Sequence, residues 1–204
     1  MRQHNDELRE QILQVATPAF TKRGYAAVSV RDLATTLQIS KGNIYNYFAS
    51  KEALFASCIG DTASALSDTL TAMEAKYTLA QTEQTSNPEF FSNIEQELLT
   101  VFKRSGVAIN LLLNCSDGSA LAGGAERLKV LTNHVTLAIL RLNHAYPNRP
   151  DLATAFAATF AESLISCLQT IIRHQYPATV HAAMLDNYIG IFDNGLKQTI
   201  RSNQ

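Results

Sequence analysis

One short stretch of the chain, KGNIYNY, concentrates side chains that can hydrogen-bond to nucleic acid. Lys41 is a cation that can reach guanine N7 and O6, and the carboxamide of Asn46 can bond to a base edge. The hydroxyl groups of Tyr45 and Tyr47 suit phosphate oxygens, which position a protein on DNA without reading its sequence. Gly42 has no side chain, so the backbone there can approach a groove closely. We therefore predict that this stretch is a helix that enters the major groove of double-stranded DNA.

Four residues around this helix are further candidates for DNA contact: Ser29, Arg31, Ser40 and Lys51. Ser29 and Lys51 stand at or next to predicted helix N-termini, where backbone N–H groups attract anions such as phosphate. Ser40 directly precedes the reading helix and is its predicted N-cap. For the two tyrosines, the alternative is ordinary core packing with a solvated hydroxyl group.

The elements that must position these side chains are two short helices joined by a three-residue turn. Leu33, Leu37 and Ile44 are apolar at the spacing of a helix-turn-helix. Ile39 fills the corner between the helices, and the small side chain of Ala34 lets them cross closely. This spacing predicts a compact DNA-reading domain.

Cap residues agree with this division of the segment. Ser29 and Asp32 have the spacing of a capping box, and Ser50 can cap a third helix that begins after it. Gln38 lies in the turn, where glycine is usual, and a non-glycine residue held at positive φ there costs about 1 kcal/mol.

The segment from about Ile12 to Phe55 resembles the N-terminal domain of the TetR family of bacterial transcriptional regulators. The residues that carry the resemblance are AFTKRGY, SVRDLATTLQIS and KGNIYNYFASKEALF. The resemblance implies a homodimer that binds a palindromic operator and represses transcription. It also implies release from DNA when a small apolar or amphipathic molecule enters the helical body of the protein.

Composition indicates an all-α protein without a membrane span. The 204 residues include only nine Gly and five Pro, and periodic apolar positions run through most of the chain. No stretch of about eighteen apolar residues occurs, and the N-terminus lacks the apolar core of a signal peptide. Cys58, Cys115 and Cys167 show no CxxC spacing, which favours reduced thiols in a cytoplasmic protein.

Catalytic motifs are absent from the sequence: it contains no GxSxG, GxxxxGK[ST], HExxH or GxGxxG. Its five histidines have no ligand spacing. We therefore expect no enzyme activity, no metal and no cofactor.

The charge is divided unevenly along the chain. Residues 1–55 carry seven Lys/Arg and five Asp/Glu, whereas the remainder carries ten Lys/Arg and thirteen Asp/Glu. A protein that coats nucleic acid would be far more basic throughout. Mild positive charge near the N-terminus favours a DNA reader that makes few phosphate contacts.

We expect two domains: a helix-turn-helix DNA-binding domain over residues 1–50 and a helical effector-binding and dimerisation domain over residues 51–204. In the first, a helix over Asn5–Arg23 bends at Pro18 and ends at Gly24 in a left-handed cap. In the second, helices are predicted over residues 51–80, from 87 onward, and over 106–114, 119–145, 151–176 and 179–200.

The predicted effector pocket is apolar and lies among the helices of the second domain. Its expected lining residues are Phe91, Phe102, Leu111, Val135 and Phe156, with Tyr77 or His134 as polar anchors. The alternative is that these aromatic residues simply fill the core.

The predicted dimer interface uses the helices at about 151–176 and 179–200, because the first of them has two apolar faces. Phe156, Phe160 and Leu164 are assigned to the core of the protomer. The small-residue face, which contains Ala157 and Ala161, is assigned to the partner across a two-fold axis.

These observations predict a ligand-responsive transcriptional regulator, expected to be a repressor. The alternative is a helical DNA-binding interaction protein that is controlled by a protein partner instead of a metabolite. An enclosed cavity in the second domain favours the first hypothesis, and a solid core with an exposed apolar groove favours the second.

Overall fold

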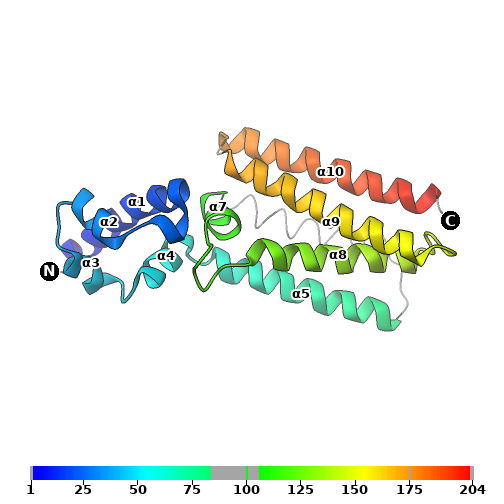
Figure 1. Ribbon diagram of the computed structural model, residues 1–204, viewed down its shortest axis with the longest axis horizontal. Helices are drawn as coiled ribbons and strands as arrows, with labels where there is room; N and C mark the ends of the chain where they lie inside the picture. Colours follow the sequence, from blue (N-terminus) through cyan, green and yellow to red (C-terminus); the bar gives the residue numbers. More distant parts are fainter. Residues whose placement is uncertain (1, 84–99, 101–105, 175, 203–204) are drawn as a thin grey trace. The chain divides into compact units, whose positions relative to one another are not determined.

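The computed structural model describes residues 2–83, 100, 106–174 and 176–202, and within these ranges its regular secondary structure is helical (Figure 1). The predicted all-α class is therefore confirmed. The helices are α1 (Arg2–Ala27), α2 (Val30–Thr36), α3 (Lys41–Tyr47), α4 (Lys51–Ile59), α5 (Thr62–Glu83), α7 (Gly106–Asn114), α8 (Gly124–Leu142), α9 (Pro150–Arg173) and α10 (Ala178–Ser202). The helix predicted from residue 87, which carries Phe91 and Phe102, lies outside the described residues.

The chain divides into two compact units that differ from the predicted domains. The first unit contains residues 1–63 and 107–124, and the second contains residues 64–106 and 125–204. Helix α4 belongs to the first unit because it packs on α1, where the rings of Phe20 and Phe55 meet edge to face with their centroids 5.0 Å apart. The first unit therefore extends beyond residue 50 and includes a segment from the middle of the sequence.

The core of the first unit joins α1 to the three helices that follow it. Ile12 and Phe20 of α1 are fully buried, as are Leu54 and Phe55 of α4. Leu33 of α2 is also buried, so one apolar core supports the whole helix-turn-helix. Segment α7 begins and ends where the sequence predicts, and its residues 108–113 are all buried.

Two glycines interrupt helices in the first unit. Gly24 has φ 76° and ψ 162°, so the helical dihedral angles stop there, as predicted, although ψ is extended and not that of a left-handed cap. Helical geometry continues through Pro18. Gly60 has φ 59° and ψ −144°, a conformation almost confined to glycine, and it separates α4 from α5. The prediction of one long helix over residues 51–80 was therefore wrong.

In the second unit, α9 packs with α10 and places its alanine face in the core. Ala153, Ala157 and Ala161 are 3%, 0% and 0% exposed. Ala153 and Ala157 lie with core residues of α8 such as Leu131 and Val135. Phe156, Phe160 and Leu164 on the other face are only half-buried. The predicted assignment of the alanine face to a partner was therefore wrong, because small residues let α9 approach its neighbours closely within the protomer. Phe156 and Phe160 pack against the same core, as predicted.

Helix α9 is also the one described helix that is long and apolar enough to cross a membrane by length and composition. Its alanine face is buried in the second unit. The remaining helix ends differ little from prediction, except that α8 begins at Gly124 and not near residue 119.

Candidate nucleic-acid interface

Helix α3 is anchored by two apolar residues and exposes most of its polar side chains. Ile44 is 1% exposed and Phe48, the C-cap, is 3% exposed. Tyr45 and Asn46 face outward together with Lys41 at the start of the helix. The helix is therefore held on the core by its apolar side while it presents cationic, carboxamide and phenolic groups to a ligand.

The turn between α2 and α3 has the strained conformation predicted from the sequence. Gln38 has φ 56°, and the amide of Ile39 donates to the carbonyl oxygen of Ala34 at 3.0 Å. A non-glycine residue in this region is unfavourable by about 1–2 kcal/mol, so the surrounding contacts must maintain it. This turn determines the direction in which α3 leaves α2.

Two of the predicted caps are confirmed. The hydroxyl oxygen of Ser40 accepts the amide of Asn43 at 3.2 Å, and that of Ser50 accepts the amide of Ala53 at 3.0 Å. Each satisfies one backbone N–H group at a helix start, which is worth about 1 kcal/mol.

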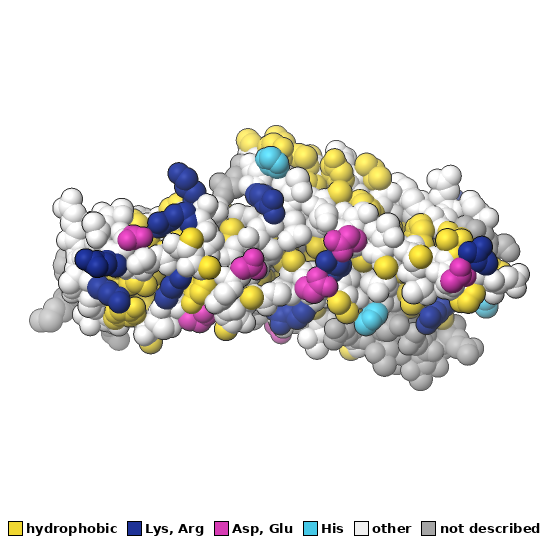
Figure 2. Space-filling model, in the orientation of Figure 1, with side chains coloured by type: hydrophobic (Ala, Val, Ile, Leu, Met, Phe, Trp, Pro, Cys, Tyr) yellow, Lys and Arg dark blue, Asp and Glu magenta, His cyan; other side chains and the backbone are white. Residues whose placement is uncertain are grey.

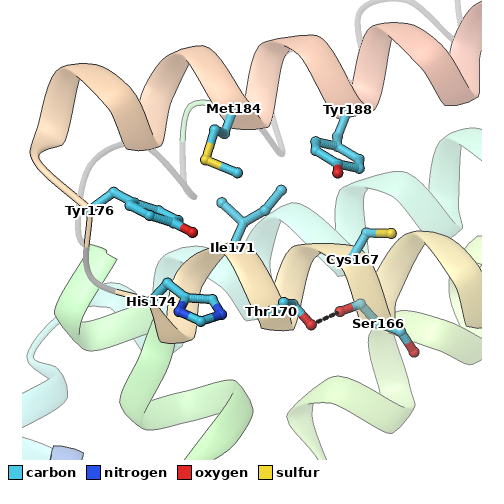
Figure 3. Close-up of a pocket in the computed structure, with 8 residues that line it drawn as sticks. All are labelled: Ser166, Cys167, Thr170, Ile171, His174, Tyr176, Met184 and Tyr188. Atoms are coloured by element: carbon cyan, nitrogen blue, oxygen red, sulfur yellow. Dashed lines mark hydrogen bonds between the residues drawn. The ribbon is translucent and has the colours of Figure 1, made fainter.

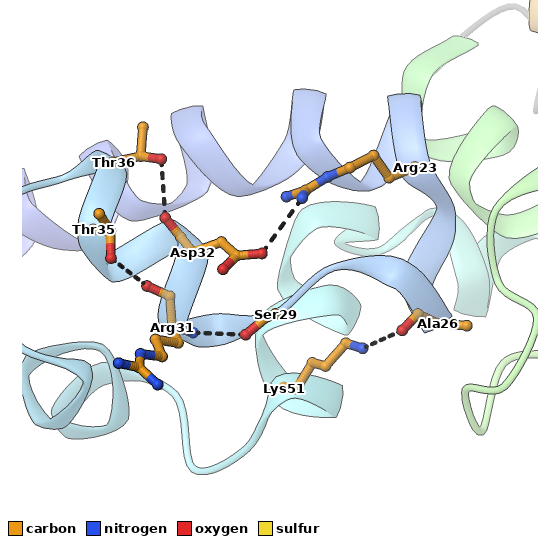
Figure 4. Close-up of polar contacts among 8 residues, drawn as sticks. All are labelled: Arg23, Ala26, Ser29, Arg31, Asp32, Thr35, Thr36 and Lys51. Carbon is orange, nitrogen blue, oxygen red and sulfur yellow. Dashed lines mark hydrogen bonds and ion pairs between the residues drawn. The ribbon is translucent and has the colours of Figure 1, made fainter.

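The capping box at α2 is only half formed. Ser29 accepts the amide of Arg31 at 3.1 Å, whereas the carboxylate of Asp32 accepts from the guanidinium of Arg23 at 3.5 Å (Figure 4). The tertiary contact with α1 draws the Asp32 side chain away from the backbone of Ser29. Both cap hydroxyls, Ser29 and Ser40, can still donate their O–H to a phosphate oxygen while accepting from the backbone.

Within α3, Lys41 and Tyr45 interact one helical turn apart. The ammonium of Lys41 lies 5.3 Å from the centroid of the Tyr45 ring, a cation–π distance. Both residues are exposed, whereas Tyr47 is half-buried. The contact holds the Lys41 stem along the helix surface, so its charge lies next to the phenol that is predicted to bind phosphate.

Of the other predicted DNA contacts, Arg31 is exposed and Lys51 is not free. The guanidinium of Arg31 projects away from Ser29 and Asp32 in Figure 4. The ammonium of Lys51 instead lies 4.1 Å from the Tyr25 ring centroid and donates to the carbonyl oxygen of Ala26 at 3.4 Å (Figure 4). Burial against these groups lowers the pKa of Lys51. Only the tertiary structure reveals this internal role.

Positive charge is present on the surface that carries these residues. On the face drawn in Figure 2, several Lys and Arg side chains lie on the first unit, with uncharged and a few acidic side chains between them. This arrangement suits a polyanion that is bound through a few contacts.

The residues predicted to line an effector pocket are divided between the two units, as far as the structure describes them. Leu111 is fully buried in the first unit, whereas Val135 is a core residue of the second. His134 is exposed, and Phe156 stacks on Phe160 with ring centroids 5.9 Å apart. Phe91, Phe102 and the side chain of Tyr77 lie outside the described residues.

A pocket does occur in the second unit, between α9 and α10 (Figure 3). Its volume is about 360 Å³, and it is lined by Ser166, Cys167, Thr170, Ile171, His174, Tyr176, Met184 and Tyr188. At one end of the pocket the rings of His174 and Tyr176 are stacked, with their centroids 5.5 Å apart. This site was not predicted from the sequence, although Cys167, Ile171 and His174 have helical spacing along α9, as Met184 and Tyr188 do along α10.

Comparison with known proteins places the helix-turn-helix in a family. Residues 12–58 match the family described as "Bacterial regulatory proteins, tetR family". An uncharacterized HTH-type transcriptional regulator, YerO of Bacillus subtilis, is 40% identical over 52 residues, which are 26% of this chain and 18% of that protein. The HTH-type transcriptional repressor DhaR of a Mycobacterium species is 32% identical over 63 residues, 31% of this chain and 32% of that protein.

A third relative also matches over a short segment only. The HTH-type transcriptional repressor KstR2 of Mycolicibacterium smegmatis is 38% identical over 53 residues, 26% of each chain. Matches to these relatives thus cover less than a third of the relatives' own lengths. A TetR-family transcriptional regulator of Pectobacterium atrosepticum aligns with 96% of this chain and 97% of its own at 17% identity, with a TM-score of 0.46.

The family match spans the part of the first unit in which α2, the Gln38 turn and α3 lie. The buried Ile44, the serine caps and the outward-facing polar residues of α3 all fall within it. Residues 12–58, which contain the helix-turn-helix, therefore match the TetR family of bacterial regulatory proteins.

Proposed function

We propose that this protein is a transcriptional regulator that binds double-stranded operator DNA through α3. The observation that carries the proposal is the asymmetry of α3, which buries Ile44 on the core and exposes Lys41, Tyr45 and Asn46. A short helix with this arrangement can lie in the major groove while its apolar side keeps it attached to the domain. Repression is the mode of regulation that the family resemblance favours.

The residues of the interface have different proposed roles. Lys41 reads base edges, with guanine N7 and O6 as acceptors, and Asn46 is a second candidate reader. Tyr45, Tyr47 and Arg31 contact phosphate oxygens and thereby set the orientation of α3. Lys51 contributes through its contacts with Tyr25 and Ala26 more than through phosphate.

Selection of binding sequences from a random pool of duplexes by the full-length chain tests this proposal. We expect an inverted repeat whose half-site centres are separated by about 34–36 Å or a multiple of this distance. Recovery of no sequence, or of sequences without two-fold symmetry, would contradict it.

Two substitutions separate base reading from phosphate contact. Lys41→Ala should cost about 1–3 kcal/mol of discrimination and relax the preference at one base pair. Arg31→Ala should weaken binding to all sequences alike and reduce the slope of log K against log salt by about 1. Lys129→Ala is the matched control, because Lys129 pairs with Glu126 and Glu162 in the second unit.

We propose that the protein binds DNA as a homodimer through the outer faces of α9 and α10. The face of α9 that carries Phe156 and Phe160 is half-buried, and on α10 the side chains of Tyr188 and Ile191 are 39% and 64% exposed. These apolar side chains are continuous across the two helices, since Phe160 and Phe192 meet edge to face at 5.2 Å. A two-fold axis would let the same surface meet itself and bury it.

The interface can be tested without damaging the protomer. Ile191→Glu places a charge on a side chain that is already exposed, so it should dissociate the dimer and leave the free energy of unfolding of the protomer within about 0.5 kcal/mol. Ala158→Glu, at an exposed position of α9 about 160° around the helix from Phe156 and Phe160, is the control. If sedimentation showed Ile191→Glu to be dimeric, the interface would lie elsewhere.

The finer part of the proposal is release from DNA by a small molecule bound in the second unit. Its support is the family resemblance together with the pocket of about 360 Å³ between α9 and α10. The mixture of hydroxyl, aromatic and sulfur-containing side chains there suits a small amphipathic molecule with an aromatic ring. A library screen should yield compounds that release the operator from the wild-type protein but not from a Tyr176→Ala variant.

Control by a protein partner is the second candidate. It is favoured by the exposed apolar side chains of Val180 and Ile191 on α10 and of Tyr176, which lies between α9 and α10. Control by a small molecule and control by a protein partner predict different results in the screen for operator release. If no small molecule in the screen shifts operator affinity while the Ile191→Glu variant remains able to bind DNA, the protein-partner hypothesis is the better one.

A further inference from the structure

A turn from the middle of the sequence is bound to the first unit by hydrogen bonds from two directions. The amide of Tyr25 donates to the carbonyl oxygen of Cys115 at 2.7 Å. The amide of Ala120 donates to the Oε1 atom of Glu52 at 3.0 Å, across 68 positions of sequence. Residues 115–120, which we call the docked turn, are therefore attached both to the end of α1 and to the first turn of α4.

Glu52 and Tyr25 are themselves joined, so the two attachments form one cluster. Burial raises the pKa of Tyr25, and the hydrogen bond that its hydroxyl donates to the Glu52 carboxylate raises it further. The Tyr25 ring also carries the Lys51 ammonium at 4.1 Å and meets the Phe55 ring edge to face at 5.0 Å. Disturbing the docked turn would therefore disturb the packing of α1 against α4.

The docked turn lies in a segment of the first unit that is joined at both ends to the second unit. Residues 107–124 belong to the first unit, but the residues that precede and follow them belong to the second. A conformational change in the second unit thus has a covalent route to the docked turn from both of its ends. Helix α1 also packs against α2, and α4 follows α3 after only three residues, so a change in the α1–α4 packing reaches the reading helix.

We propose that Glu52 is a positioning residue for DNA binding, because it ties the docked turn to the α1–α4 pair and thereby couples the order of that turn to the DNA affinity of α3. This inference rests on the proposed DNA-binding function. Binding linkage is reciprocal, so operator DNA should stabilise the docked turn by the same factor by which the docked turn strengthens DNA binding.

Three variants of the full-length chain test the coupling. Glu52→Ala removes the acceptor and should weaken operator binding about tenfold, the effect expected for one hydrogen bond to a charged group. Glu52→Gln keeps a carbonyl oxygen at the same place and should restore most of the affinity. Ala120→Pro removes the donor; it should be tolerated because the amide of Ala122 bonds to the carbonyl of Ser119 and places residue 120 where proline is favoured in a turn.

The double variant Glu52→Ala/Ala120→Pro gives the decisive comparison. If the hydrogen bond carries the coupling, the double variant should bind the selected duplex within about twofold of either single variant, since each removes the same contact. If the loss of affinity in the double variant equals the product of the two single losses, the proposal is overturned. Glu126→Ala, which removes an exposed carboxylate of the second unit, controls for the loss of negative charge.

Amide hydrogen exchange supplies a readout that a purely structural role would not change. In the wild-type chain, the selected duplex should slow exchange at Tyr25 and Ala120 about tenfold, and in Glu52→Ala this protection should be absent. Equal protection in both proteins, or wild-type affinity in Glu52→Ala, would overturn the coupling and leave the proposed DNA binding intact. If selection recovers no duplex at all, the proposed function falls and the coupling falls with it.

Discussion

Replacing Ala157 by glutamate tests which face of α9 is buried within the protomer. Ala157 is 0% exposed and lies in the core of the second unit with Leu131, Val135 and Ile139. A glutamate there must bury its carboxylate among apolar side chains. The substitution should therefore unfold the protomer or reduce its stability severely, whereas an alanine face directed at a partner would give a folded monomer.

The expected loss of stability has two parts. A buried, unpaired carboxylate avoids its desolvation penalty by taking up a proton, which for an ordinary glutamate pKa of about 4.3 costs about 3.7 kcal/mol at pH 7. The added side-chain atoms cost a further amount of about 1–3 kcal/mol in a packed core. The sum of about 5–7 kcal/mol is comparable to the whole stability of a typical domain, about 5–15 kcal/mol.

The titration of this glutamate gives a second signature. Its folded pKa is raised above the unfolded value, so the penalty is present above the unfolded pKa and disappears as the pH falls towards it. The proton cost should fall from about 3.7 kcal/mol at pH 7 to about 1 kcal/mol at pH 5. Ala157→Gln should show the packing cost without this pH dependence.

Urea unfolding followed by circular dichroism at pH 7 and pH 5 measures both parts, and sedimentation gives the oligomeric state. Ala158→Glu, at the exposed neighbouring position, should unfold like the wild type at both pH values. The reasoning is refuted if Ala157→Glu is folded and monomeric with wild-type stability, because the alanine face would then be directed away from the core.

Three further predictions concern the backbone and one buried histidine. Gly60→Ala should reduce the free energy of unfolding by about 1–3 kcal/mol because of its φ of 59°, whereas Gly190→Ala, in a helix with open space around it, should increase it slightly. Gln38→Gly should stabilise by about 0.5–1 kcal/mol by relieving the positive φ, as urea midpoints would show. Burial lowers the pKa of His181, so stability should decrease as the pH falls below about 6.5, and His181→Phe should remove that decrease in melts at pH 7.5 and 5.5.

Local features of the DNA-reading segment could be predicted from the sequence alone. The caps at Ser40 and Ser50, the positive φ of Gln38 and the burial of Ile44 all depend on residues within a few positions of one another. Such interactions are encoded by residue type and helical spacing, so no knowledge of distant contacts was required. The family resemblance relies on the same short segment.

The tertiary structure decided those features for which the local sequence allowed two conformations or two buried faces. Periodicity shows that α9 has two apolar faces, but only the packing of α8, α9 and α10 shows that the alanine face lies inside. Gly60 stands within an otherwise continuous helical pattern, where glycine can either continue a helix or end it.

The fate of charged side chains also depended on contacts between distant residues. Lys51 lies beside a predicted helix N-terminus and was expected to bind phosphate, yet it contacts Tyr25 and Ala26. Glu52 meets the amide of Ala120, a partner 68 positions away that no local pattern indicates. The sequence by itself determined that this chain carries a helix-turn-helix, because that motif is built from local spacing. Only the tertiary structure determined what supports the motif, because the free energy of a long-range contact depends on which surfaces the fold brings together.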